Sequence, residues 1–165
     1  MANKLFLKVA DLAAIEGDYY KSIENYEKVA KSSVSNNLMK WSVKDYFLKA
    51  GMCHLASNVS QPSPPSIPLY HCLWPVPTTD HLAPLQDMVA TSRALSSYRD
   101  LDPTFASTRE HQLLVDLSEA VEQGDQEVFA DKLFQYDQLS KLDKWKTTIL
   151  LRVKEGIEEK GEDFS

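Results

Sequence analysis

Apolar residues recur along most of this chain at spacings of three and four, which is the pattern of amphipathic helices. Leu5, Val9 and Leu12 open the series, and Ile149 and Val153 belong to its last stretch. The pattern predicts helices over Asn3–Ala14, Tyr19–Lys31, Asn36–Ala56, Met88–Arg99, Pro103–Glu122, Asp125–Leu139 and a last segment capped by Asp143. No stretch alternates as a strand does, so we predict an all-α chain of antiparallel helix pairs.

Short motifs mark several of the predicted turns. Glu16-Gly17-Asp18 ends the first predicted helix, and Gln123-Gly124-Asp125 resembles a later copy of this turn in which Asp125 can cap the next helix. Asp102-Pro103 predicts a further helix start, with Asp at the N-cap and Pro at the first helical position.

The first glycine turn resembles the turn and second helix of a tetratricopeptide unit. In such a unit a small residue, here Ser22, lets two helices approach, and an aromatic residue, here Tyr26, packs across the pair. The two turns are two periods of about 40 residues apart once the proline-rich segment described next is subtracted. This spacing predicts a middle turn near Ser57.

One segment breaks the helical pattern. Seven of the eight prolines lie in Val59–Gln86, which has 28 residues, no Lys, Arg or Glu, and a single acid, Asp80. Proline removes a helix hydrogen-bond donor and clashes with the preceding turn. Connections between paired helices normally have about 2–8 residues, so we interpret Val59–Gln86 as a proline-rich insertion and expect it to be disordered.

Three origins of this insertion stay open. We favour a translated retained intron, because Val-Ser can be encoded as GTA-AGT, Gln as CAG, and the implied 84 nucleotides, three per residue, keep the frame. A genuine insertion in one species' protein is the first alternative. A ligand for an SH3-type domain is the second, although Pro62-Ser-Pro-Pro65 lacks a flanking Arg or Lys.

The length, charge and composition of the chain exclude several classes of protein. The 165 residues suffice for a single α-helical domain over residues 1–165, and the net charge of −6 argues against a nucleic-acid binder. No apolar run approaches the roughly 18 residues of a spanning helix, and the N-terminus lacks the pattern of a secretory signal. Cys53 and Cys72 make no disulfide framework. We therefore expect a cytoplasmic protein.

Basic residues repeat on the predicted first helices of successive pairs. Lys4 and Lys8 are four residues apart, as are Lys40 and Lys44, and Arg109 follows on the third pair. The spacing of these basic residues has two possible explanations. They can form a basic stripe along one face of a solenoid, or they can be ordinary solvated surface residues whose spacing is due to chance. Residues 87–165 hold 17 acidic and 10 basic residues, whereas residues 1–58 hold 6 and 8. The two ends of the chain therefore suit partners of opposite charge.

Other candidate chemistry is weak. Cys53-His54 and His71-Cys72 match no zinc-ligand spacing. Glu119 and Glu122 share a helix face, but no nucleophile accompanies them, and no glycine-rich phosphate loop is present. We expect no cofactor, no metal and no enzymatic activity.

Four blocks resemble the C-terminal half of the α-SNAP family, the soluble attachment proteins for the NSF-type ATPase. They are Ala2–Ala10, Trp41–Ala50, Asp102–Glu110 and Leu142–Leu151, in the family's order. The resemblance covers residues 2–58 and 87–164, and the segment between has no counterpart. It implies a TPR-like α-solenoid of antiparallel helix hairpins with a C-terminal helical bundle. It also implies an adaptor that binds the SNARE four-helix bundle (syntaxin-type), is peripheral on membranes through SNARE complexes, and recruits and stimulates the ATPase for SNARE disassembly in vesicle fusion.

The resemblance also assigns residues to the two partners. Positions that match the family's SNARE-binding face are Lys4, Lys8, Lys40, Trp41, Lys44 and Arg109. Positions that match its ATPase-binding residues are Asp87, Glu119, Glu122, Glu162, Asp163 and Phe164. Phe164 stands where the family has a penultimate leucine.

Two departures qualify the expected function. The resemblance begins about halfway along the family's sequence, so we expect much of the SNARE-binding surface to be missing. The proline-rich segment also adjoins Asp87. A generic TPR-like interaction scaffold and a truncated, non-functional gene-model product are the alternative interpretations.

Overall fold

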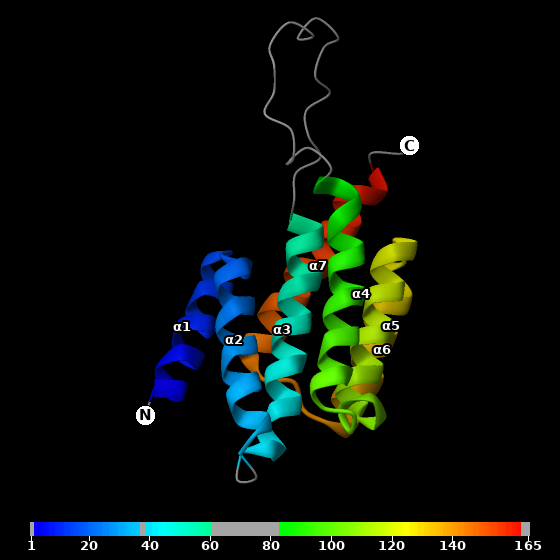
Figure 1. The fold of residues 1–165 in the computed structure, drawn as a ribbon. Helices are drawn as coiled ribbons and strands as arrows, with labels where there is room; N and C mark the ends of the chain where they lie inside the picture. The colour runs from blue at the N-terminus through cyan, green and yellow to red at the C-terminus, as the bar shows by residue number, and fades with distance from the viewer. Residues whose placement is uncertain (1, 37–38, 61–82, 163–165) are drawn as a thin grey trace, which may run out of the picture.

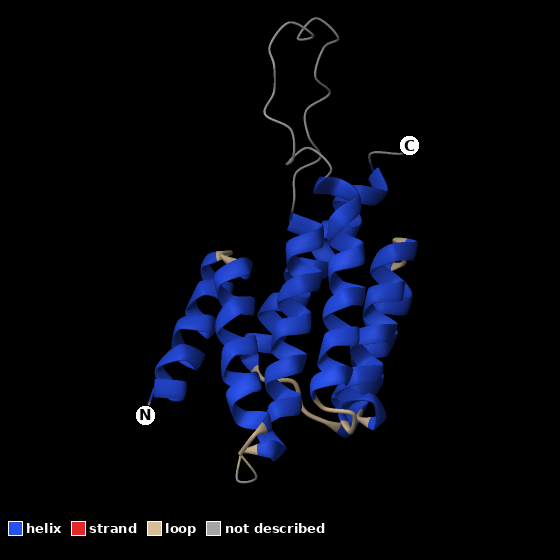
Figure 2. Ribbon diagram, in the orientation of Figure 1, coloured by secondary structure: helices blue, strands red, loops and turns tan. Residues whose placement is uncertain are grey.

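The structure is a computed structural model that describes residues 2–36, 39–60 and 83–162, with side chains described for 3–36, 39–60 and 90–157. The described ranges contain α-helices, one short 3₁₀ helix and no strand (Figures 1 and 2). The elements are α1 (Ala2–Glu16), α2 (Tyr19–Val34), α3 (Lys40–Ser60), α4 (Ala83–Leu101), η1 (Phe105–Ser107), α5 (Arg109–Gln123), α6 (Gln126–Leu139) and α7 (Lys144–Glu162). The all-α prediction is confirmed.

The helices form three consecutive antiparallel pairs, α1–α2, α3–α4 and α5–α6 (Figure 1). The last helix, α7, packs mainly on α3 and also contacts α1 and α6. The fold is thus a helical solenoid whose successive pairs are joined along one side by α7.

The centre of the molecule is α3, which is buried along most of its second half. It packs against α2, α4, α5 and α7. Phe47 of α3 stacks on Tyr98 of α4 with ring centroids 4.6 Å apart, and contacts Phe105 of η1 at 5.2 Å. Buried residues from α1 through α7 join around it in one hydrophobic core.

The two glycine turns have the same construction. Gly17 and Gly124 adopt left-handed backbone angles, with φ of +91° and +69°, which only glycine adopts at little cost. The next residue caps the following helix in both: Asp18 accepts a hydrogen bond from the backbone N–H of Lys21, and Asp125 accepts two from the first turn of α6. The predicted N-cap Asp125 is confirmed, and Asp18 is a second cap of the same kind.

Ser22 and Tyr26 also lie as the tetratricopeptide resemblance implies. Ser22 is fully buried, and its hydroxyl donates to the carbonyl oxygen of Ala10 at 2.9 Å, where α1 and α2 approach closely. Tyr26 is fully buried, and its hydroxyl reaches across the pair to donate to the Asp11 carboxylate of α1, while its ring packs edge-to-face against Trp145 of α7.

The predicted helix Pro103–Glu122 is wrong at its start. Asp102 does not cap a helix; its carboxylate accepts hydrogen bonds from the backbone N–H and the hydroxyl of Thr104, which makes a local turn. A 3₁₀ turn, η1, follows, and α5 begins only after Thr108, whose hydroxyl caps it by accepting from the N–H of His111.

The predicted helix Asn36–Ala56 is shifted toward the C-terminus. It begins at Lys40 and continues to Ser60, so no turn occurs near Ser57, which is buried inside α3. Helices also cover both ends of the predicted insertion Val59–Gln86, because α3 ends at Ser60 and α4 begins at Ala83. The expectation of disorder concerns residues 61–82, which lie outside the described residues.

Candidate partner-binding surfaces

Six residues that the family resemblance assigns to SNARE binding lie on α1, α3 and α5, and all six are exposed. We call them the basic face: Lys4, Lys8, Lys40, Trp41, Lys44 and Arg109. Trp41 stands out because 85% of its surface is exposed. Large aromatic residues are commonly buried, so this side chain is available for a contact with another molecule.

The basic face lies toward one end of the solenoid. The helices α1, α3 and α5 all begin at the lower end in Figure 1, and Lys40, Trp41 and Arg109 belong to the first turns of α3 and α5. A helix N-terminus carries a partial positive charge of about half an elementary charge. The three N-termini therefore add to the positive potential that the side chains create.

Ion pairs tie the three helices to one another. Lys49 of α3 lies 2.9 Å from Asp11 of α1, and Lys44 of α3 lies 3.0 Å from Glu110 of α5. The second pair brings the members on α3 close to Arg109, the neighbour of Glu110 in sequence. Lys4 and Lys8 lie on the other side of α3, along α1.

Lys49 is not part of the basic face, although it follows Lys44 in the sequence. Its side chain is only 15% exposed, and its ammonium lies 4.7 Å from the ring centre of Trp145 and 5.7 Å from that of Tyr26. These cation–π contacts and the pair with Asp11 make it a structural residue. The sequence contained no signal that separates Lys49 from its exposed neighbours.

Two cations of α7 are likewise used inside the protein. Lys146 pairs with Asp45 of α3. The guanidinium of Arg152 donates to the carbonyl oxygens of Ala14 and Ile15 at 3.0 and 2.7 Å, and so satisfies the C-terminal end of α1. The first two helix pairs are therefore held to α7 by charged groups as well as by the core.

Four of the acidic residues that the resemblance assigns to ATPase binding belong to the opposite end. The start of α4 and the ends of α5 and α7 lie at the upper end in Figure 1. Asp87 lies near the start of α4, and Glu162 is the last residue of α7. Glu119 and Glu122 are exposed near the end of α5. Asp163 and Phe164 lie outside the described residues, so the structure does not place them.

A polar cluster between α2, α3 and α4 was not predicted. The Glu27 carboxylate accepts hydrogen bonds from Tyr98 at 2.9 Å and Lys31 at 3.2 Å, and His54 Nε2 lies 3.8 Å away. His54, then Tyr98 and Lys31, lower the pKa of Glu27 to about 2. At 3.8 Å the imidazole is beyond hydrogen-bond distance, so its interaction is an ion pair when protonated.

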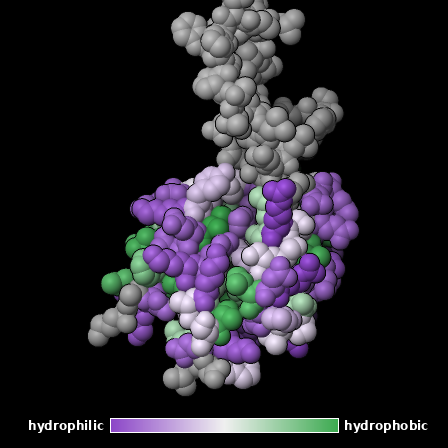
Figure 3. Space-filling view, in the orientation of Figure 1, coloured by the Kyte–Doolittle hydropathy of each residue, from purple (hydrophilic) through white to green (hydrophobic). Residues whose placement is uncertain are grey.

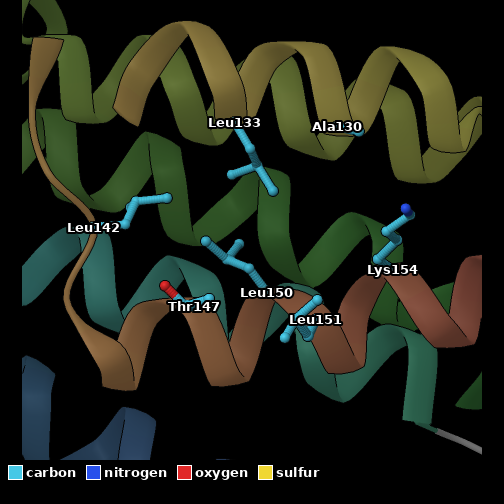
Figure 4. Close-up of a pocket in the computed structure, with 7 residues that line it drawn as sticks. All are labelled: Ala130, Leu133, Leu142, Thr147, Leu150, Leu151 and Lys154. Atoms are coloured by element: carbon cyan, nitrogen blue, oxygen red, sulfur yellow. The ribbon is translucent and has the colours of Figure 1, made fainter. Parts of the chain in front are cut away.

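The surface also has apolar features. Figure 3 shows hydrophobic residues among mainly hydrophilic ones, and α1 exposes Leu5 and Leu12 by 66% and 60%. A cavity of about 160 Å³ opens between α6 and α7 (Figure 4). Its lining is apolar apart from Thr147 and Lys154. Such a lining can accept an apolar side chain but offers no group of converging polar atoms for catalysis.

The described part of the chain contains no cluster of His, Cys, Asp or Glu that could hold a metal ion. Cys53 is buried against the hydroxyl of Ser22 at 3.4 Å, and burial raises the pKa of its thiol to about 12; His71 and Cys72 lie outside the described residues. Among the helices described, none combines the length and apolar character needed to cross a bilayer.

The sequence is similar to those of known proteins. Residues 1–63 and 81–158 match the family described as "Soluble NSF attachment protein, SNAP". The chain is 47% identical to the probable vesicular-fusion protein sec17 homolog of Schizosaccharomyces pombe, over 100% of this chain and 47% of that protein. It is 37% identical to the alpha-soluble NSF attachment protein of Saccharomyces cerevisiae, over 99% of this chain and 47% of that protein.

The chain also matches about half the length of a human relative. Identity to the human alpha-soluble NSF attachment protein is 35%, over 99% of this chain and 45% of that protein. The chain therefore spans about half the length of these relatives. The family match leaves out residues 64–80, a shorter range than the predicted insertion. The family match extends over most of the chain on both sides of these residues, and the chain belongs to the soluble NSF attachment protein family.

Proposed function

We propose that this chain is an adaptor, not an enzyme, that links SNARE complexes to an NSF-type AAA+ ATPase. Its basic face binds the acidic surface of a SNARE four-helix bundle, and its acidic end binds the ATPase. ATP hydrolysis by the ATPase then separates the SNARE proteins after vesicle fusion. In this role the chain acts in the cytoplasm and reaches membranes only through the SNARE complex.

One observation carries the proposal: the helices that carry the basic face begin at one end of a solenoid with one core, whereas Asp87, Glu119, Glu122 and Glu162 lie toward its other end. An adaptor that joins two partners needs two surfaces that can be occupied at once. The distribution of charge also gives each surface a different preference, since complementary charge selects partners and speeds association.

The basic face suits reversible binding. Its lysines are long, flexible side chains, and each exposed ion pair contributes about 0–1 kcal/mol. Binding by several such pairs weakens with salt. Trp41 adds a large apolar contact among these charges, and tryptophan is among the residues that most often dominate an interface.

A pull-down experiment tests the proposal. The immobilised 165-residue chain is incubated with purified NSF-type ATPase, with and without a preassembled SNARE bundle. We expect the SNARE bundle to bind and the ATPase to be recruited. Lys44→Glu should reduce SNARE binding, and removal of Phe164 and Ser165 should reduce ATPase recruitment.

The matched control is Lys21→Glu. Lys21 is exposed like Lys44 but lies in the first turn of α2, at the opposite end of the first pair. It should bind both partners as the unmodified chain does. A folded chain that binds neither partner, or a Lys21 variant that loses as much as the Lys44 variant, would argue against the proposal.

A further inference from the structure

We propose that Glu110 regulates the basic face by holding Lys44 in an internal ion pair, so that an acidic partner has to compete with this carboxylate for the lysine. The inference rests on the proposed function and assigns a role to a residue that the family resemblance left without one.

The geometry of the pair supports this role. The ammonium of Lys44 lies 3.0 Å from Glu110 Oε1, and the Glu110 side chain is only 13% exposed, against 45% for Lys44. The acid is thus held in the protein while the lysine still faces solvent. Glu110 is also the second residue of α5, where the helix N-terminus favours a negative charge.

The negative charge of Glu110 also affects the side chain of Tyr136. Tyr136 of α6 lies near it, and burial together with the charges of Glu110 and Asp45 raises the pKa of Tyr136 to about 12. The field of the carboxylate therefore acts on neighbouring groups as well as on Lys44, and it would repel a partner carboxylate that approaches this part of the basic face.

Lys44 differs in this respect from the other cations of the basic face. Lys4, Lys8, Lys40 and Arg109 form no ion pair within the described part of the chain. A partner gains their full attraction, but gains less from Lys44 as long as Glu110 is ionised. The exposed-pair range of about 0.2–1 kcal/mol corresponds to a factor of about 1.4 to 5 in affinity.

The test is a double-mutant cycle on binding to a preassembled SNARE four-helix bundle. Dissociation constants are measured for the unmodified chain, Glu110→Gln, Lys44→Gln and the double variant, at about 50 and 200 mM salt. We expect Glu110→Gln to tighten binding by a factor of about 1.4 to 5 at low salt and less at high salt. Lys44→Gln should cost more affinity in the Glu110→Gln background than in the unmodified chain.

The matched control is Asp116→Asn, on the same helix. Asp116 pairs with Lys132 of α6 at 3.2 Å, so this variant removes one negative charge and one ion pair away from Lys44. Its affinity should stay within the error of the unmodified chain. Thermal unfolding of each variant separates a change in fold from a change in binding, and Glu110→Ala provides a second removal of the charge.

The outcomes are distinct. An equal effect of Lys44→Gln in both backgrounds, weaker binding by folded Glu110→Gln, or equal tightening by Asp116→Asn would each overturn the role of Glu110 while leaving the proposed function intact. Failure of the unmodified, folded chain to bind the SNARE bundle would overturn the proposed function and this inference with it.

Discussion

The indole nitrogen of Trp145 donates a hydrogen bond to the main-chain oxygen of Asp11 at 3.0 Å, which joins α7 to α1 across 134 positions in the sequence. The same ring packs edge-to-face on Tyr26 and lies 4.7 Å from the ammonium of Lys49. One tryptophan therefore contacts α1, α2 and α3, and we expect it to contribute strongly to stability.

Trp145→Phe should lower the free energy of unfolding by about 1 kcal/mol, because it removes the hydrogen-bond donor but keeps an aromatic ring. Trp145→Ala should cost about 3 kcal/mol, because the cavity it leaves adds to the lost contacts. Urea unfolding followed by circular dichroism measures both. Trp41→Ala, at a side chain that is 85% exposed, should change stability by less than about 0.5 kcal/mol. Equal costs at the two tryptophans would contradict this assignment.

Glu27 should make stability depend on acid pH. Its folded pKa of about 2 lies below the ordinary value of 4.5, chiefly because of His54. A lowered carboxyl pKa stabilises the fold above the unfolded pKa, and the contribution is lost as pH falls through the folded value. Glu27→Gln should therefore cost about 1–3 kcal/mol at pH 6 and progressively less below about pH 4.5.

Urea unfolding from pH 6 to pH 3 checks this dependence. The control is Glu24→Gln on the same helix, because Glu24 is exposed and forms no hydrogen bond or ion pair in the described part of the chain. The difference between the unmodified chain and this control variant should not vary with pH. A constant cost of Glu27→Gln over the whole range would refute the prediction.

Gly156 and Val59 lie where α7 crosses α3. A methyl group at position 156 would overlap the side chain of Val59, so Gly156→Ala should destabilise the protein by about 1–3 kcal/mol despite the better helix propensity of alanine. The cost should be smaller by about 1 kcal/mol in a Val59→Ala background, where the overlapping atoms are gone. Urea unfolding of the four proteins measures this coupling, and a coupling of zero would show that the helices do not meet at these residues.

Deletion of residues 64–80, which the family match leaves out, tests the predicted insertion. Five residues would then connect α3 to α4 in place of 22. If the deleted residues contribute no packing, loop-closure entropy predicts a gain of about 1 kcal/mol in stability. Thermal melts of both chains decide this, and a loss of cooperative unfolding on deletion would show that the segment is part of the fold.

Sequencing of the transcripts tests the retained-intron hypothesis separately, because a message that carries the codons of Val59–Gln86 in most copies would exclude it.

Much of the fold could be predicted because its signals are local. The glycine and aspartate of each turn act through their own backbone angles and hydrogen bonds, so Gly17 and Gly124 could be recognised from the sequence. The start of α5 could not be. Asp102 and Thr108 are both good N-cap residues. In the structure Asp102 instead forms a local turn with Thr104, Phe105 of η1 packs on Phe47 of α3, and Thr108 caps the helix.

The candidate surfaces could likewise be predicted only in part. The spacing of Lys8 and Lys44 can be read from the sequence, and the antiparallel pairing places the N-termini of α1, α3 and α5 at one end. The partner of each lysine depends on how neighbouring helices cross. Lys44 faces Glu110 and Lys49 faces Asp11, and no spacing along the chain distinguishes the exposed lysine from the structural one.

The position of α7 determines how the molecule would respond to mechanical load. In a simple row of hairpins, a pulling force could peel the units apart one at a time, with few contacts broken at each step. Here α7 packs along α3 and reaches both α1 and α6, so tension applied to its C-terminal end is distributed over several helices and resisted by shear along a long interface. The solenoid should yield as one unit, at a higher force than its separate hairpins.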